Sequence, residues 1–102
     1  YTIETYLHIA SLIANLFRCN SSHLELYPLL NVALVLSNLN REEITVNCMW
    51  AFANATLWPE ADLQLILKTV PDLPKLLLKY LEATSSSILS PTLRTIGNLG
   101  SY

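Results

Sequence analysis

The sequence predicts an all-α protein that is built from repeated units of three helices. Glycine occurs only 2 times in 102 residues, which is too few for the many tight turns of a β-sandwich or a β-barrel. Apolar residues make up 52% of the chain and charged residues 14%, whereas about a quarter of an average domain is charged. Much of the surface of each helix must therefore be buried against other helices. The third observation is a short pattern that recurs along the chain.

The recurring pattern is an apolar segment of eight residues with asparagine at its seventh place, found at 9–16, 48–55 and 92–99. When the segments are aligned on Asn15, Asn54 and Asn98, they lie 39 and 44 residues apart. Armadillo and HEAT repeats have periods of about 40–47 residues. The spacing therefore predicts an armadillo-type right-handed superhelical solenoid of three-helix repeats. An ordinary helical bundle, in which asparagine recurs by chance, is the alternative.

The periodicity of the apolar residues predicts a series of helices. They cover 3–18, about 22–26, 27–38, 41–57, 59–69, 72–83 and 87–99. The units are then the third helix of an incomplete repeat at 3–18, and full repeats at 19–57 and 58–102. Because the chain starts without methionine and at once in a helical pattern, we expect it to be a piece of a longer protein.

Two helix starts carry recognisable signals. Asn40 precedes Glu43 by three residues, which predicts a capping box in which the Asn40 side chain accepts from the Glu43 N–H. The last helix has two candidate starts, because Ser90 precedes Pro91 and Ser87 is an equally good N-cap.

The charges and cysteines exclude several kinds of site. The net charge is −2, and the six basic residues are scattered, so we expect no binding to nucleic acid. Lys75 and Lys79 are expected on a solvated helix face. Cys19 and Cys48 lack metal-ligand spacing and lie in helical patterns, so we expect two buried, reduced thiols.

The sequence also predicts no catalysis, no cofactor and no membrane span. The two histidines, His8 and His23, have no partners at the spacing of a catalytic triad or a metal site. A nucleophile elbow and a nucleotide-binding loop are both missing. The longest apolar runs are too short and too interrupted to cross a bilayer.

We expect the residues that bind a partner to lie on one face of the third helix of each unit. Residues at i, i+4, i+7 and i+11 share a face of a helix. In the three segments this face carries Glu4, His8, Ser11 and Asn15; Glu43, Asn47, Trp50 and Asn54; and Ser87, Pro91, Arg94 and Asn98. Trp50 is thus a large aromatic residue on an otherwise polar face, which favours a ligand contact over a core position.

The recurring asparagine has two interpretations. A carboxamide both donates and accepts, so it can bridge neighbouring parts of the protein or pair with the backbone of a bound peptide. Helices stack about 8–10 Å apart and an extended chain advances about 3.3 Å per residue. A row of asparagines would therefore meet a bound strand about every three residues, which suits peptide binding.

The motif Trp50-x-x-x-Asn54 and the closing run at 89–99 resemble importin alpha (karyopherin alpha), the armadillo-repeat adaptor of nuclear import. The resemblance covers nearly the whole chain and is strongest at 41–57 and 73–99. In that family, tryptophans on the third helices stack against lysines of a nuclear localisation signal. Asparagines one turn further on hold the signal's backbone, and acidic residues that line the groove receive its ammonium groups.

The resemblance implies a role for each matching residue. Trp50 would be the stacking residue, and Asn15, Asn54 and Asn98 would hold the peptide backbone. Arg94 is similar to an arginine that replaces tryptophan in a repeat between the family's two peptide sites. The further candidate contacts on the same face are Asn47, Glu43 and Ser11.

The sequence also departs from the family pattern. Ser11 stands where tryptophan is expected, and the only acidic residues on the face are Glu4 and Glu43. The glycine that usually precedes the second helix is absent from both full repeats. These departures indicate a divergent member or one with a weakened cargo groove.

The resulting expectation is a protein-binding adaptor and not an enzyme. Its partner would be a basic nuclear localisation peptide, with importin beta bound through a segment outside these residues. Its place would be the cytoplasm and the nucleus. The alternative is an armadillo scaffold that binds a partner unrelated to import.

Overall fold

The computed structural model describes residues 2–19 and 24–100, which are helical without any strand. The elements are α1 (Ile3–Cys19), the 3₁₀ turn η1 (Leu24–Leu26), α2 (Leu29–Ser37), α3 (Glu42–Leu57), α4 (Leu63–Thr69), α5 (Leu73–Tyr80) and α6 (Ser86–Gly100). The all-α prediction is confirmed, and each predicted helix has a counterpart. The beginning of the helix expected near 22–26 lies outside the described residues.

The largest differences in length concern two helices: α4, expected at 59–69, begins at Leu63, and α5, expected at 72–83, ends at Tyr80. The backbone turns first, with the Ala61 N–H donating to the Trp58 carbonyl at 3.0 Å. Asp62 then caps the helix, because its side chain accepts from the Leu65 N–H at 3.0 Å. Asp62 is a good N-cap residue, and this signal locates the true start.

The capping box expected at Asn40 is wrong. Arg41 is the N-cap of α3, and no side chain caps the helix there. Asn40 has a φ of 59°, in the left-handed region that asparagine tolerates better than most residues. The sharp turn between α2 and α3 thus uses Asn40 for its backbone conformation, which directs its side chain away from a capping role.

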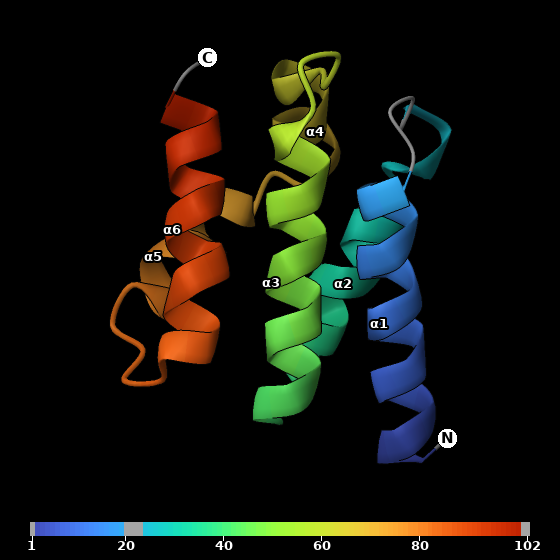
Figure 1. The fold of residues 1–102 in the computed structure, drawn as a ribbon, viewed down its shortest axis with the longest axis vertical. Coiled ribbons are helices and arrows are strands. Elements are labelled where there is room, and N and C mark those ends of the chain that lie inside the picture. The colour runs from blue at the N-terminus through green and yellow to red at the C-terminus, as the bar shows by residue number, and fades with distance from the viewer. Residues whose placement is uncertain (1, 20–23, 101–102) are drawn as a thin grey trace.

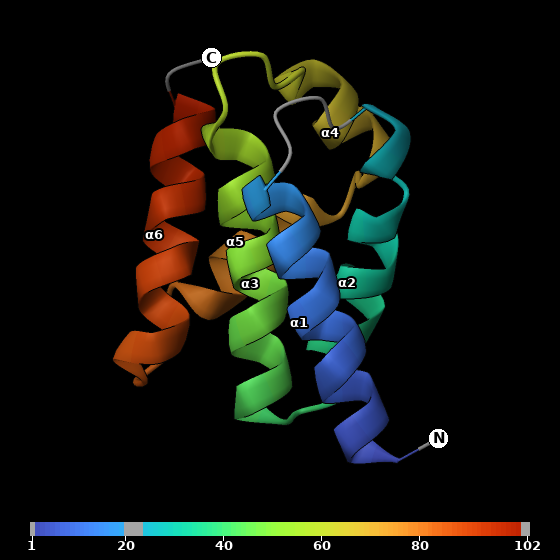
Figure 2. The same ribbon diagram turned by 45° about the vertical axis from the view of Figure 1, so that its right-hand side comes forward.

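The helices form two layers. The front layer holds α1, α3 and α6 side by side, with α3 in the middle and all three running in the same direction (Figure 1). In the second layer, α2 and α5 lie behind them (Figure 2). The most extensive packing is between α1 and α3 and between α3 and α6. The helices that carry the recurring asparagine are therefore direct neighbours, although they are far apart in sequence.

The core fills the space between the two layers. Its largest buried side chains are Phe17, Tyr27, Leu30, Ile44, Met49, Phe52, Ile66 and Leu73. The α3 helix is buried along most of its length, because it has neighbours on both sides and behind. Only the remaining front side of α3 reaches solvent, and Trp50 lies there.

The cysteines divide into one buried and one exposed thiol. Cys48 is buried in α3, and desolvation raises its pKa from 9.0 to about 12. Cys19 is exposed, so the expectation that both thiols are buried is wrong for this residue. It is the last residue of α1.

Candidate functional site

A shallow groove of about 330 Å³ runs between the front sides of α1 and α3. We call it the α1–α3 groove, and its lining residues are Ala14, Asn15, Arg18, Asn47, Trp50 and Asn54. Four of the candidate residues, Asn15, Asn47, Trp50 and Asn54, are thus brought together. Asn15 comes from α1, whereas Asn47, Trp50 and Asn54 come from α3.

Two of the recurring asparagines connect neighbouring helices. The Asn54 Nδ2 donates to the Ala14 carbonyl at 3.0 Å, and the Asn98 Nδ2 donates to the Ala53 carbonyl at 3.2 Å. In both pairs the acceptor is the residue just before the asparagine of the preceding helix. The Asn98 Nδ2 also donates to the Thr56 hydroxyl at 3.1 Å.

These bonds show the first interpretation of the asparagine, the internal bridge, directly. A carboxamide nitrogen has two N–H groups and its oxygen is a separate acceptor. Asn54 is half-buried and lines the groove, so one bond to Ala14 leaves part of its hydrogen-bonding capacity facing outward. Bridging and peptide contact are therefore compatible in this residue.

The other two asparagines of the groove differ from Asn54. The Asn47 Nδ2 donates to the Glu43 carbonyl of its own helix at 2.9 Å. Asn15 is exposed, and no other described residue hydrogen-bonds its carboxamide. Among the described α-helices, α3 lies beside α1 on one side only (Figure 1), so none of them offers Asn15 a carbonyl in the way that α1 offers one to Asn54.

Trp50 is half-buried at the edge of the core and faces the groove. The guanidinium carbon of Arg94 lies 5.7 Å from the centroid of the indole ring. This is the geometry of a cation–π contact, which contributes about 0.5–1 kcal/mol at an exposed site. The chain's own Arg94 therefore supplies a cation to the indole ring.

The remaining candidate residues lie outside the groove lining. Glu43 is exposed in the first turn of α3, and Ser11 is half-buried in α1. Pro91 is buried, so the expected polar face is wrong at this position of α6. His8 is exposed, and His23 lies outside the described residues.

Arg18 is a groove residue that the sequence reasoning missed. It follows Asn15 by three residues, so both lie on the same side of α1, and this spacing would have been enough to find it. Arg18 is the one basic residue in the described lining of the groove, and Arg94 contacts Trp50 without being part of that lining. The carboxylates Glu4 and Glu43 lie in the first turns of α1 and α3, away from this part of the groove.

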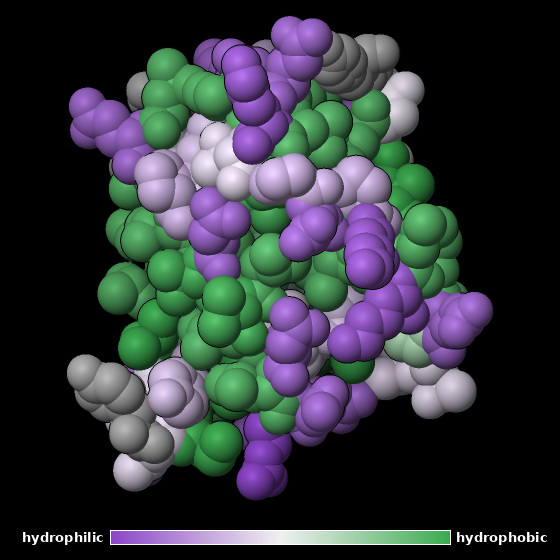
Figure 3. Space-filling model, turned by 180° about the vertical axis from the view of Figure 1, so that it is seen from behind, coloured by the Kyte–Doolittle hydropathy of each residue, from purple (hydrophilic) through white to green (hydrophobic). Residues whose placement is uncertain are grey.

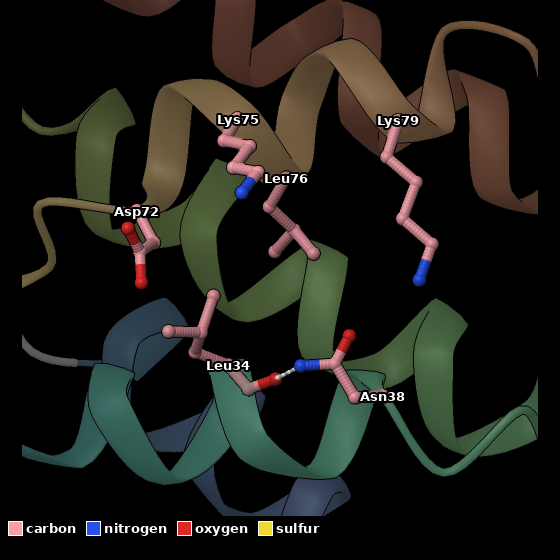
Figure 4. Close-up of a pocket in the computed structure, with 6 residues that line it drawn as sticks. All are labelled: Leu34, Asn38, Asp72, Lys75, Leu76 and Lys79. Atoms are coloured by element: carbon pink, nitrogen blue, oxygen red, sulfur yellow. Dashed lines mark hydrogen bonds between the residues drawn. The ribbon is translucent and has the colours of Figure 1, made fainter.

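A second hollow, of about 490 Å³, lies between α2 and α5 on the rear of the molecule. Figure 4 shows Leu34 and Asn38 on one side of it, and Asp72, Lys75, Leu76 and Lys79 on the other. Lys75 and Lys79 are exposed, as expected. Seen from behind, polar side chains gather over α5 and apolar ones over α2 (Figure 3), where Val35 is 64% exposed.

Within the described ranges, no cluster of three or more His, Cys, Asp or Glu side chains is arranged to hold a metal ion. None of the helices described here combines the length and the apolar character that a membrane span requires. Comparison of the chain with protein-family models, with curated proteins and with solved structures finds no significant match.

Proposed function

We propose that this protein is a peptide-binding adaptor of the armadillo type. An extended segment of a partner protein would lie across the front layer, in the α1–α3 groove and over α6. One observation carries the proposal: asparagines and a tryptophan from helices distant in sequence line a single groove. The neighbouring α1, α3 and α6 each carry the recurring asparagine at the same place.

The spacing of the helices supports an extended ligand. Neighbouring helices stack about 8–10 Å apart, and a strand advances about 3.3 Å per residue. A peptide that crosses the front layer at right angles would pass a new helix about every three residues. Asn15 and Asn54 would contact its backbone, and Trp50 would pack against one side chain.

The first candidate ligand is a lysine-rich nuclear localisation peptide, as the resemblance to importin alpha implies. Shuttling between cytoplasm and nucleus, with an importin beta partner, would follow from it. In this arrangement a lysine of the ligand replaces Arg94 over the indole. Because one cation replaces another on the same ring, this contact adds little to the free energy of peptide binding.

The second candidate is a scaffold or adaptor whose partner is unrelated to import. The position of Arg18 favours it, because a guanidinium group in the groove lining repels a lysine and attracts a carboxylate. The lining of the groove contains no acidic residue. Such a partner would present a neutral or acidic extended segment.

Titration with two synthetic peptides distinguishes these candidates. One peptide is lysine-rich, and the other has the same length with each lysine replaced by glutamate. Intrinsic fluorescence is followed in the native chain and in Trp50→Leu, which keeps Trp58 as an internal control. A micromolar response to the lysine peptide that disappears in Trp50→Leu supports the import adaptor. A response to the glutamate peptide alone supports the scaffold, and no response to either contradicts peptide binding in this groove.

A further inference from the structure

The hollow between α2 and α5 has the features of a second binding site, and we call it the α2–α5 groove. We infer that it binds a short extended segment of a partner protein, in which an apolar residue lies between two acidic ones. The groove is on the rear of the molecule, so this inference does not depend on what the α1–α3 groove binds. Its two walls are internal helices, since α2 lies between η1 and α3, and α5 lies between α4 and α6.

Hydrogen bonds join the two sides of the α2–α5 groove near both of its ends. The Tyr80 hydroxyl of α5 donates to the Ser37 carbonyl at the end of α2 at 2.8 Å. The Asn31 Nδ2 of α2 donates to the carbonyl of Thr69, just before α5, at 3.1 Å. Between these points α2 and α5 are not a closely packed pair, and about 490 Å³ stays open. This volume is in the range of ligand sites, about 300–1,000 Å³, and a preformed site lowers the ordering cost of binding.

The floor of the groove is apolar and its α5 side is positively charged. Leu34 of α2 and Leu76 of α5 point toward one another at its centre (Figure 4). Lys75 and Lys79 are exposed on the α5 side. No carboxylate of the described residues forms an ion pair with either lysine. Both ammonium groups are therefore free to meet a charged ligand.

Charge and desolvation together favour an acidic ligand over a purely apolar one. Covering the groove takes two ammonium groups partly out of water, which is costly unless carboxylates pair with them. The only acidic residue of the lining is Asp72, which lies at one end of the groove (Figure 4). The lining therefore carries a positive charge, although the whole chain has a net charge of −2. A partner segment with two carboxylates complements it.

The spacing of the lysines indicates the pattern of the ligand. Lys75 and Lys79 are four residues apart on α5, which corresponds to about 6 Å along the helix axis. In an extended segment, residues i and i+2 point to the same side about 6.6 Å apart, and the residue between them points to the opposite side. A Glu-Leu-Glu segment along α5 would thus place its leucine on the apolar floor and a carboxylate at each ammonium group. The Asn38 Nδ2 donates to the Leu34 carbonyl at 3.2 Å (Figure 4), which leaves the Asn38 Oδ1 to accept from the ligand backbone.

Fluorescence anisotropy with a labelled peptide that has Glu-Leu-Glu at its centre tests the inference. Two control peptides carry Gln-Leu-Gln or Glu-Ser-Glu at the same place. The native chain should bind the first peptide saturably in the micromolar range. It should bind each control peptide at least about fivefold more weakly, because one lacks the charges and the other lacks the apolar side chain.

Substitutions in the groove locate the binding. Lys75→Gln and Lys79→Gln should each weaken it about two- to fivefold, as expected for one exposed ion pair. Lys68→Gln is the matched control, because it removes the same charge from α4 outside the groove lining, and it should leave the affinity unchanged. Asp72→Asn should strengthen binding, because it removes the carboxylate that competes with the ligand for the lysines. All four residues are exposed, so circular dichroism should show the native helix content in each variant.

Several outcomes would overturn the inference. They are no saturable binding up to about 1 mM, and equal losses in Lys68→Gln and Lys75→Gln, which would indicate general attraction by charge. Trp50→Leu and Arg18→Gln should not affect this binding, and a loss in either would place the acidic peptide in the α1–α3 groove instead. Sedimentation velocity adds one more test, because dimers of the native chain that the peptide dissociates would mean that a second copy, and not a separate partner, fills the groove.

Discussion

At the scale of single residues, the contact between Arg94 and Trp50 determines what the groove can bind. The Arg94 guanidinium lies 5.7 Å from the ring centroid, so a cation of a ligand would compete with it for the attraction of the indole. The sequence places both residues on the same helical face of their segments. It does not show that they meet, because their contact depends on the side-by-side packing of α3 and α6.

The first prediction concerns this pair. Arg94→Gln removes the cation from the ring, so binding of a lysine-rich peptide should strengthen about two- to fivefold, the equivalent of the roughly 0.5–1 kcal/mol of an exposed cation–π contact. Fluorescence titration measures the change. Lys75→Gln removes the same charge from the rear of the molecule and controls for net charge. Equal effects of the two substitutions would mean that Arg94 does not compete for Trp50.

The second prediction concerns the cysteines. Cys19 is exposed and Cys48 is buried, so a thiol reagent under native conditions should modify one thiol rapidly. The other should react only as fast as the protein opens. Cys19→Ser should abolish the rapid phase and Cys48→Ser the slow phase, as measured by absorbance of the released chromophore. Rapid reaction of both thiols in the native chain would contradict this burial.

The raised pKa of Cys48 also has a consequence for stability. Below pH 9 the thiol is protonated in the folded and in the unfolded chain, and it contributes no pH dependence. Between its ordinary value of 9.0 and about 12, the unfolded chain loses the proton first. The free energy of unfolding should then fall by up to about 1.4 kcal/mol per pH unit. Cys48→Ala should remove this component from denaturant titrations above pH 9, and an unchanged slope would exclude it.

At the scale of helices, the asparagines hold α1, α3 and α6 in register. The position of these residues is predictable, because asparagine recurs at a constant place in an apolar segment. The use of Nδ2 for the carbonyl of the preceding helix is not, since it depends on which backbone oxygen the packing brings within reach. Arg18 shows the opposite case, because the spacing from Asn15 was sufficient to place it on the groove.

The third prediction tests the bridge from Asn54. Asn54→Ala removes its bond to the Ala14 carbonyl, so the free energy of unfolding should fall by about 1 kcal/mol. Asn47→Ala removes a bond within a single helix and is the matched control, with a smaller expected loss. Chemical denaturation followed by circular dichroism measures both. Equal losses would mean that the bridge between the helices has no particular importance.

The fourth prediction concerns the turn that leads into α3. Asn40 has a φ of 59°, a conformation that glycine adopts without strain. Asn40→Gly should therefore leave stability unchanged or raise it slightly, whereas Asn40→Ala should lower it by about 1 kcal/mol. Thermal unfolding measures the two variants against the native chain. A loss in Asn40→Gly as large as in Asn40→Ala would show that the side chain matters more than the backbone conformation.

At the scale of the whole molecule, hydrogen bonds connect segments that are far apart in the sequence. The Tyr27 hydroxyl accepts from the Asp62 N–H at 3.0 Å, and the Trp58 Nε1 donates to the Phe17 carbonyl at 2.7 Å. The Tyr80 hydroxyl donates to the Ser37 carbonyl at 2.8 Å. None of these pairs has a signal in the sequence, because each joins residues that are more than thirty positions apart. The all-helical class was predictable from the sequence, but these connections between distant segments were not.

The last prediction is that the described helices unfold as one unit in spite of the repetition in the sequence. Units of a repeat protein are coupled through their interfaces, and here α3 is shared, since it packs against both α1 and α6.

Tyr80→Phe removes the hydrogen bond from α5 to the end of α2. The Ser37 carbonyl keeps the Thr45 hydroxyl as a donor at 3.2 Å, so the loss should be about 0.5–1 kcal/mol. Circular dichroism, which reports on all helices, and tryptophan fluorescence, which reports on the region of α3, should give the same shifted midpoint. If the circular dichroism midpoint moved and the fluorescence midpoint did not, the α5–α6 region would unfold independently, and the shared interface of α3 would be too weak to couple the two sides of the front layer.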